Sequence, residues 1–248
     1  MPIDTLPIVM ITASVILLIG LSKGGLGGAA GTAAAPLLSL VMPPEMAIGL
    51  LLPLLMITDI FAVTVHWNRW EKRLLILLIP SSVIGVTLGT LLITSISSDM
   101  LRSGLGIFVL IFVFYKLLET RIQKSLHYEV HNWHGYLAGA TAGFGSTLAH
   151  AGGPPIVIYL LLQDITPRCF IATSAAYFAI INWIKLPYYA YAGIIDLNRL
   201  LGVIWLMPLI PVGVLIGRWL STRINKISFE RVILLLLIIT AVLLLCGS

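Results

Sequence analysis

Long apolar stretches separated by short polar loops make up most of the chain. The stretches run over residues 6–42, 46–65, 74–93, 100–118, 134–163, 169–192, 200–220 and 231–246. Several of them reach the roughly 20 residues that a helix needs to cross the hydrocarbon core of a bilayer. The short alternating segments of a membrane β-barrel are missing from the sequence. The pattern therefore predicts an all-α polytopic membrane protein.

The first apolar stretch is too long for one membrane crossing. The 37 residues from Leu6 to Met42 would form a helix of roughly 55 Å, whereas the hydrocarbon core is about 30 Å thick. Within this stretch, glycines occupy positions 24, 25, 27, 28 and 31. Because glycine is where a long helix breaks most readily, we expect a helical hairpin with arms near Leu6–Leu21 and Ala29–Val41. The pattern leaves open whether the arms span the membrane or re-enter it.

The segment Ala140–Pro155 echoes this small-residue pattern in the second half of the chain. Gly25-Leu26-Gly27 corresponds to Gly143-Phe144-Gly145, and Pro36 falls at the same offset as Pro154. The apolar stretch around the echo is again longer than one crossing, so we expect a second break within it. The residues expected to break it are Gly143, Gly145, Gly152, Gly153, Pro154 and Pro155.

Two further correspondences extend the repeat over most of the chain. Counted from Pro44 and Pro167, Asp59 and Asn182 occupy the same place. Farther along, Pro80, Gly85 and Gly89 match Pro208, Gly213 and Gly217. The four-residue spacing within each glycine pair predicts close packing of helices.

Basic residues predict how the repeats are oriented. They gather in the loops 66–73, 116–133, 163–168 and 218–231, which share one face if each glycine-rich unit enters and leaves on the same side. Arg102, Lys185 and Arg199 are then left on the other face. This asymmetry obeys the positive-inside rule, and three spans per half invert the second repeat relative to the first. We therefore expect residence in the cell (inner) membrane with both termini extracytoplasmic.

The expected architecture is two inverted repeats, each a Gly-broken helical hairpin plus three transmembrane helices. Residues 1–120 form the first repeat, 121–133 a cytoplasmic linker and 134–248 the second repeat. Composition agrees with burial in lipid, because 59% of residues are hydrophobic and 10% are charged. The net charge of +5 lies in short loops, so it does not indicate a nucleic-acid partner. The sequence holds neither a Cys/His metal spacing nor an ATP-binding motif, and we expect no metal and no cofactor.

The two glycine-rich motifs resemble those of the TauE/SafE sulfite-exporter family of membrane permeases. The first reads Gly-Leu-Ser-Lys-Gly-Gly-Leu-Gly-Gly from Gly20, and the second reads Ala-Gly-Phe-Gly-Ser-Thr-Leu-Ala-His-Ala-Gly-Gly-Pro-Pro from Ala142. The resemblance covers nearly the whole chain. It implies secondary transport, commonly export, of sulfur-containing anions such as sulfite, sulfoacetate or other organosulfonates. It does not fix the solute for this chain.

An anion that crosses lipid needs partial positive charge near the midplane, which broken helices supply through free N–H groups and positive dipole ends. Residues after each break, Ala29–Thr32 and Ser146–His150, are candidates to start the second arms. We expect substrate-binding residues at Lys23, Gly24, Gly25, Gly27, Gly28, Thr32, Gly145, Ser146, Thr147, His150, Gly152 and Gly153. The alternative is that the glycines only allow helices to pack closely.

Three ionisable side chains are candidates for chemistry at these breaks. Lys23 could hold a sulfonate as a point charge, or extend to the interface as an anchor. His150 could hold an anion or carry a coupling proton, or be a packing residue with satisfied hydrogen bonds. Asp59 could relay a proton or pair with Lys23, and pairing within the fold is the favoured interpretation. Lys185, one turn beyond Asn182, is interpreted as facing the outer interface.

Two other functions compete with coupled transport. A passive small-anion channel would share the same broken helices, whereas accumulation driven by a proton gradient is expected only of a transporter. An intramembrane hydrolase using Ser146 and His150 is the enzymatic alternative. It lacks a clear orienting acid or a second catalytic motif, so we expect no enzyme. The expected partners are the anion and the lipid bilayer, and a homo-oligomer is left open.

Overall fold

The computed structural model describes residues 6–22, 31–125, 131–221, 223 and 226–246. The described residues are mostly helical and form no strand, which confirms the all-α prediction. Contacts divide the chain into two units, each assembled from separate stretches of sequence. Unit 1 comprises residues 1–54, 96–115 and 193–248, and unit 2 comprises residues 55–95 and 116–192.

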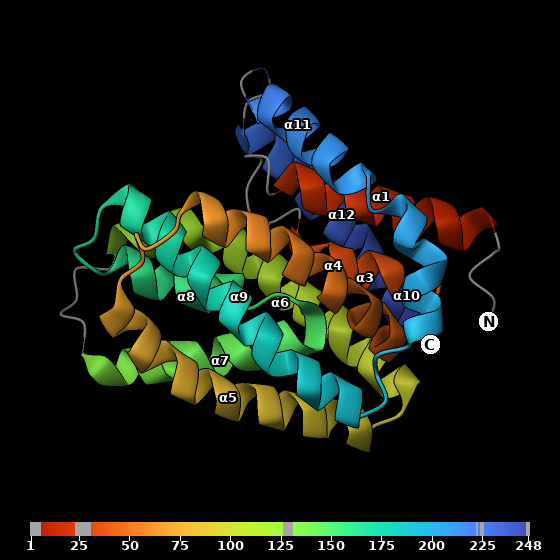
Figure 1. Ribbon diagram of the computed structural model, residues 1–248. Coiled ribbons are helices and arrows are strands. Elements are labelled where there is room, and N and C mark those ends of the chain that lie inside the picture. The colour runs from red at the N-terminus through yellow and green to blue at the C-terminus, as the bar shows by residue number, and fades with distance from the viewer. Residues whose placement is uncertain (1–5, 23–30, 126–130, 222, 224–225, 247–248) are drawn as a thin grey trace. The chain divides into compact units, whose positions relative to one another are not determined.

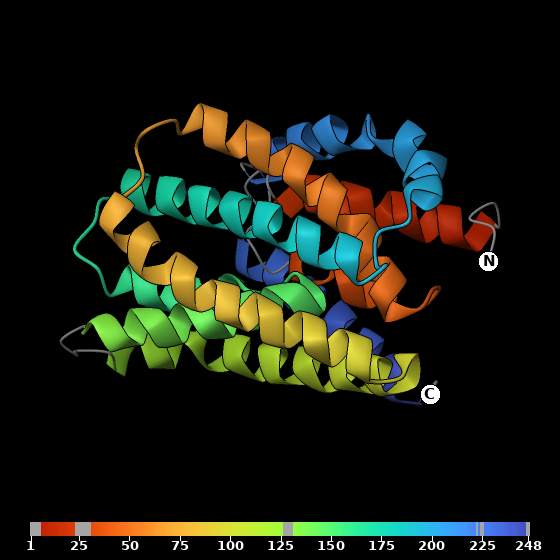
Figure 2. The same ribbon diagram turned by 60° about the horizontal axis from the view of Figure 1, so that its bottom comes forward.

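Unit 2 is built around three long helices and one short one. They are α5 (Lys72–Ser95), α7 (Asn132–Ala149), α8 (Gly153–Leu161) and α9 (Pro167–Tyr191). Helix α5 lies alongside α7 and also contacts α9, as both views show (Figure 1, Figure 2). Leu78, Ile156, Leu160 and Ile181 belong to the buried apolar cluster that these helices share. Helix α4 (Pro44–Val65) contributes its second half to this unit.

Small residues bring α5 and α7 into backbone contact. A Cβ atom at Gly85 would lie 2.1 Å from the carbonyl oxygen of Ala140, and one at Gly143 would lie 2.3 Å from that of Ser82. Since side chains cannot approach backbone so closely, glycine is required on both helices. The interface also holds a polar link, in which the hydroxyls of Ser82 and Tyr177 lie 2.7 Å apart. The packing role predicted for Gly85 and Gly89 is confirmed.

Unit 1 pairs the first helix of the chain with a helix near its end. Helix α1 (Leu6–Leu21) packs on α11 (Leu209–Ser221), and a Cβ atom at Gly213 would lie 2.7 Å from the carbonyl oxygen of Leu17. Close packing at Gly213 and Gly217 is thus also confirmed. The remaining elements of this unit are α3 (Ala34–Leu38), the first half of α4, most of α6 (Ser98–Ser125), α10 (Leu197–Val203), η2 (Ile204–Leu206) and α12 (Lys226–Cys246).

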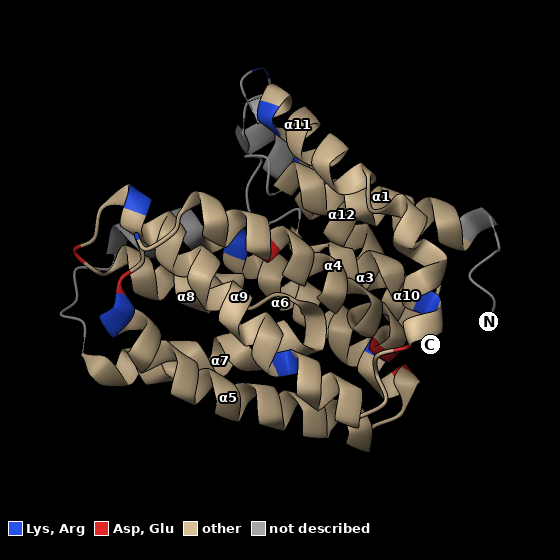
Figure 3. Ribbon diagram, in the orientation of Figure 1, with Lys and Arg blue, Asp and Glu red and all other residues tan. Residues whose placement is uncertain are grey.

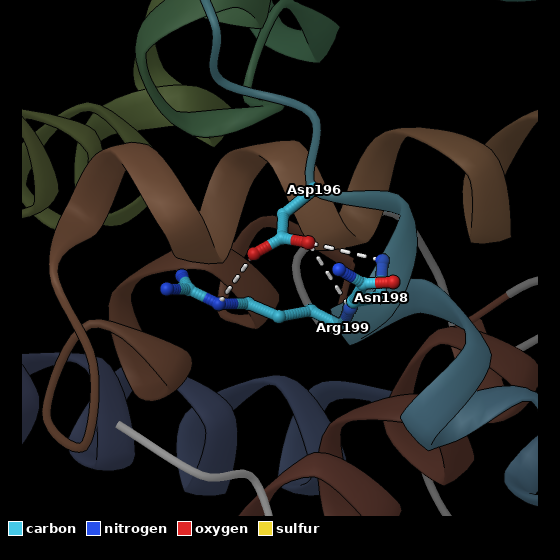
Figure 4. A network of polar contacts seen from close by, with 3 residues as sticks. All are labelled: Asp196, Asn198 and Arg199. Atoms are coloured by element: carbon cyan, nitrogen blue, oxygen red, sulfur yellow. Dashed lines mark hydrogen bonds and ion pairs between the residues drawn. The ribbon is translucent and has the colours of Figure 1, made fainter.

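The start of α10 has a well-defined N-cap. The Asp196 carboxylate accepts from the backbone N–H groups of Asn198, at 3.0 Å, and Arg199, at 3.3 Å (Figure 4). Its other oxygen lies 3.0 Å from Nε of Arg199. This cap fixes where the chain turns into α10, because it satisfies donors that the first helical turn leaves open.

The helices support a multi-pass membrane protein. Among the described residues, four helices are long and apolar enough to span a bilayer, namely Pro44–Val65, Lys72–Ser95, Ser98–Leu118 and Pro167–Tyr191. Figure 3 shows charged positions gathered mainly at helix ends and in loops. Side chains that face outward on α5 are apolar, with Ile84 60% exposed and Leu88 56% exposed. Such a surface is suited to lipid rather than water.

Two predicted elements differ from the structure. The stretch 200–220, expected as one helix, forms two helical segments, Leu197–Leu206 and Leu209–Leu220, bent by 50°. The bend coincides with Pro208, which has no N–H to continue the helical hydrogen bonds. In the second half, Gly143 and Gly145 were expected to break the helix, but both lie inside α7. The break comes after Ala149, so Ser146–Ala149 ends the first arm instead of starting the second.

Candidate functional site

The candidate site lies at the break between α7 and α8, within unit 2. His150 ends α7 in the left-handed conformation, with φ of 52°. Its N–H donates to the carbonyl of Ser146 at 3.0 Å, and the N–H of Ala151 donates to that of Gly145 at 3.2 Å. Glycine usually fills such a position, since a Cβ there costs about 1–2 kcal/mol. A strained histidine at the break suggests that its side chain has a role.

Lys185, on the neighbouring helix α9, contacts residues at this break. Its ammonium lies 3.0 Å from Oγ of Ser146, 3.2 Å from the carbonyl oxygen of Ser146 and 3.0 Å from Nδ1 of His150. The side chain is 0% exposed. An ammonium has three N–H donors, and here each has an acceptor. The interpretation of Lys185 as a residue of the outer interface is therefore wrong.

The electrostatics of the break explain how a cation is accommodated there. The C-terminal end of a helix carries partial negative charge, and α7 ends beside the ammonium of Lys185. Inserting Lys at the centre of a bilayer costs about 3 kcal/mol or more. Hydrogen bonds that involve a charged group contribute about 1.5–3 kcal/mol each, so three of them offset a cost of this size.

Tyr189 makes a second connection from α9 to the end of α7. Its hydroxyl donates to the carbonyl oxygen of Thr147, and both residues are fully buried. The Thr147 hydroxyl in turn donates to the carbonyl of Gly143 at 2.9 Å. The Tyr189 ring also meets the His150 ring edge to face, with centroids 6.4 Å apart. The carbonyls of Ser146 and Thr147, near the end of α7, thus accept hydrogen bonds from Lys185 and Tyr189 of α9.

One turn before Lys185, Asn182 contacts the buried carboxylate of Asp59. Nδ2 of Asn182 donates to Oδ2 of Asp59 at 2.6 Å, and the two residues are 5% and 2% exposed. The favoured interpretation that Asp59 pairs within the fold is confirmed, with Asn182 as a partner. Asn182, Lys185 and Tyr189 lie at helical spacing on one face of α9. This face therefore combines an amide, an ammonium and a phenol.

The start of α8 offers fewer backbone donors than the sequence pattern suggests. Gly152 is its N-cap, and no side chain caps the helix there. Pro154 and Pro155 follow Gly153, and neither has an N–H group. Any backbone contribution to anion binding in this turn is limited to amides such as those of Gly152 and Gly153.

The structure brings together the predicted residues of the second break. It does not test the prediction for the first break. Ser146, Thr147 and His150 line the contact with α9, and Gly145 forms part of the same helical turn. Gly152 and Gly153 directly follow the break. Thr32 belongs to unit 1, where it is half-buried. Lys23, Gly24, Gly25, Gly27 and Gly28 lie outside the described residues.

Sequence reasoning missed Lys185 and Tyr189 as members of the site. The sequence did contain a usable signal. Asn182, Lys185 and Tyr189 are polar residues at positions i, i+3 and i+7 of one helix. This helix has 25 residues and is long and apolar enough to span a membrane. A charged residue within such a helix indicates function by default. Counted at the offset that relates Asp59 to Asn182, Lys185 corresponds to Ala62, so the cation occurs in one half of the chain.

Comparison with known proteins places the chain in a family. No curated protein and no solved structure matches the chain. The family model of the sulfite exporter TauE/SafE matches residues 12–244, which includes both glycine-rich motifs and the α7–α8 break. The chain therefore belongs to the TauE/SafE sulfite exporter family.

Proposed function

We propose that the protein is a secondary transporter that exports small sulfur-containing anions, such as sulfite or organosulfonates, across the cell (inner) membrane. The observation that carries this proposal is the fully buried ammonium of Lys185 at the break between α7 and α8. A buried cation inside a membrane-spanning helix favours an anionic solute. Membership of a sulfite-exporter family supports the choice of solute class.

The proposed binding site combines the Lys185 charge with the polar groups around it. Ser146 and His150 contact the ammonium directly, and the amides of Gly152 and Gly153 follow in the chain. The residues expected at the first break, Lys23, Gly24, Gly25, Gly27, Gly28 and Thr32, stay predictions from the sequence. The sulfur oxyanion would be held by one full charge and several hydrogen bonds, and would then exchange them for water on release.

Reciprocal helix packing supports the proposed inverted repeats. Helix α5, from the first half, packs on α7 from the second half, through Gly85 and Gly89. Helix α11, from the second half, packs on α1 from the first half, through Gly213 and Gly217. Each half of the chain thus packs one helix on the first helix of the other half. Such reciprocal packing is expected when two repeats are related by a two-fold axis. In transporters with such repeats, solutes bind near the midplane at interrupted helices.

Proteoliposomes that contain the full chain test this function. We expect uptake of ³⁵S-sulfite that exceeds uptake by protein-free liposomes, competition by organosulfonates and accumulation under an imposed proton gradient. Thermal shift against sulfite, sulfate, thiosulfate, sulfoacetate and taurine identifies the preferred solute, since selective binding stabilises the folded state. Absence of flux and of binding for every solute would contradict the proposal. Flux that never exceeds equilibrium under a proton gradient would favour the passive channel.

The Ser146–Lys185 contact also fits a different class of function. A serine hydroxyl 3.0 Å from a lysine amine has the spacing of a Ser–Lys nucleophile and base. In this protein the same Lys185 also lies beside a carbonyl oxygen and an imidazole nitrogen, which suits an ammonium donor better than a base. Transport that survives in Ser146→Ala, without formation of a hydrolysis product, would exclude the enzymatic alternative.

A further inference from the structure

Lys185 and His150 form a pair of titratable groups that faces the break. Nζ of Lys185 lies 3.0 Å from Nδ1 of His150. When Lys185 is an ammonium, Nδ1 accepts, and the proton of a neutral imidazole resides on Nε2. The pair thus has one proton between its two nitrogens that either residue can hold. This arrangement links a fully buried amine to a histidine that is half-buried.

We infer that Lys185 and His150 share the coupling proton of the transporter, an inference that rests on the proposed function. In the transfer, an N–H bond at Nζ breaks, an N–H bond at Nδ1 forms, and the electron pair stays on Nζ. The pair keeps one positive charge throughout. Loss of the Nε2 proton from the imidazolium to water then leaves a neutral amine beside a neutral imidazole.

Two other titratable side chains, Asp59 and Tyr189, lie near the pair. From α4, Asp59 is held by Asn182, one turn from Lys185 on the same face of α9. In this contact Asp59 accepts a hydrogen bond, and the inference places the exchangeable proton on the Lys185–His150 pair. On α9 itself, the ring centroid of Tyr189 lies 5.9 Å from the ammonium.

The remaining neighbouring helices present few titratable groups. The charged residues of α5 are Lys72 and Arg73, both in its first turn. The titratable side chain of α8 is Tyr159. Lys185 and His150 thus form a titratable pair at the end of α7, where Tyr189 also contacts Thr147.

Protonation of the pair would change both its charge and its contacts. With the proton present, Lys185 donates to two atoms of Ser146 and to His150, and the positive charge favours the anion. Without the proton, the amine keeps two donors for Ser146 and its lone pair accepts from Nδ1–H of His150, so the contact with His150 reverses its direction and the charge disappears. Anion binding and protonation would thus favour each other, so proton and anion cross in the same direction. During export the proton leaves with the anion, and the outward anion gradient drives both.

The test measures protons and anions together in proteoliposomes of the full chain. The probe is labelled methanesulfonate, a strong-acid anion that does not bind protons near neutral pH, and a trapped dye reports lumenal pH. Wild-type protein is expected to move about one proton per anion, as a single shared site dictates. Lys185→Arg keeps the charge without titrating, and His150→Gln keeps an acceptor without titrating, so in both the proton-to-anion ratio should fall at least tenfold. Lys72→Arg, at an exposed position, should keep the wild-type ratio.

A second measurement covers a variant whose flux is too low to give a ratio. Calorimetric titration of methanesulfonate in two buffers of different ionisation enthalpy counts the protons taken up on binding. We expect uptake by wild-type protein and none by either variant. Wild-type ratios or wild-type proton uptake in both variants would overturn the inference, as would anion flux without protons in wild-type protein. Absence of both sulfite and methanesulfonate transport in wild-type protein would instead overturn the proposed function.

Discussion

Asp59 and Asn182, which occupy corresponding places in the two halves of the chain, hydrogen-bond to each other. Nδ2 of Asn182 lies 2.6 Å from Oδ2 of Asp59, and both side chains are buried. The contact joins the second half of α4 to α9 within unit 2. It also fixes the face of α9 that carries Lys185, three residues later in the chain.

Loss of this contact should destabilise the protein. In Asn182→Ala the Asp59 carboxylate loses a donor, and a buried hydrogen bond to a charged group contributes about 1.5–3 kcal/mol. We expect a lower midpoint for thermal unfolding of the detergent-solubilised protein. Asn198→Ala is the matched control, because the Asn198 side chain lies at the exposed start of α10 and should leave the midpoint nearly unchanged. Equal midpoints for the two variants would contradict this role of Asn182.

Replacement of a glycine in the α5–α7 interface should disrupt unit 2. A Cβ atom at Gly139 would lie 2.4 Å from the carbonyl oxygen of Leu78, so Gly139→Leu forces the helices apart. Overpacking of this kind costs about 1–3 kcal/mol or more. In Gly104→Leu, by contrast, the new Cβ atom meets no atom within 4 Å. We expect the first variant to lose yield and thermal stability in detergent and the second to match wild-type protein.

Removal of the Tyr189 hydroxyl should loosen the end of α7. Tyr189→Phe leaves the buried Thr147 carbonyl without its donor from α9, at a cost of about 1–3 kcal/mol. We expect lower thermal stability and weaker binding of sulfite, because the break would no longer be held in one geometry. Tyr191→Phe is the matched control two residues along, since Tyr191 is 97% exposed. Unchanged binding and stability in Tyr189→Phe would show that this contact does not organise the site.

The helices could largely be predicted from the sequence, because a helix needs about 20 apolar residues to cross the hydrocarbon core of a bilayer. Predicted arms and spans such as Leu6–Leu21 and 74–93 agree closely with α1 and α5 (Lys72–Ser95). The position of the second break could not be predicted, because glycines within a helix and glycines at its end give the same signal. Gly143 serves helix packing, whereas Gly152 caps α8.

The candidate site was predicted only in part, since its cation comes from a distant part of the sequence. Ser146, Thr147 and His150 follow from the glycine-rich motif. Lys185 lies 39 residues beyond Ser146, and only the folded packing of α9 on the end of α7 brings the two together. The length rule that predicts helices says nothing about which helix faces which.

The most direct test of the account is counterflow of ³⁵S-sulfite in proteoliposomes that contain Lys185→Met or Lys72→Met. Both variants remove one lysine charge and keep a flexible side chain. Lys185 is fully buried beside Ser146 and His150, whereas Lys72 is exposed at the start of α5. We predict that counterflow is at least tenfold slower in Lys185→Met, because this variant loses an anion contact worth about 1.4 kcal/mol or more. We predict a wild-type rate for Lys72→Met. Equal rates in the two variants, with both proteins folded, would contradict it.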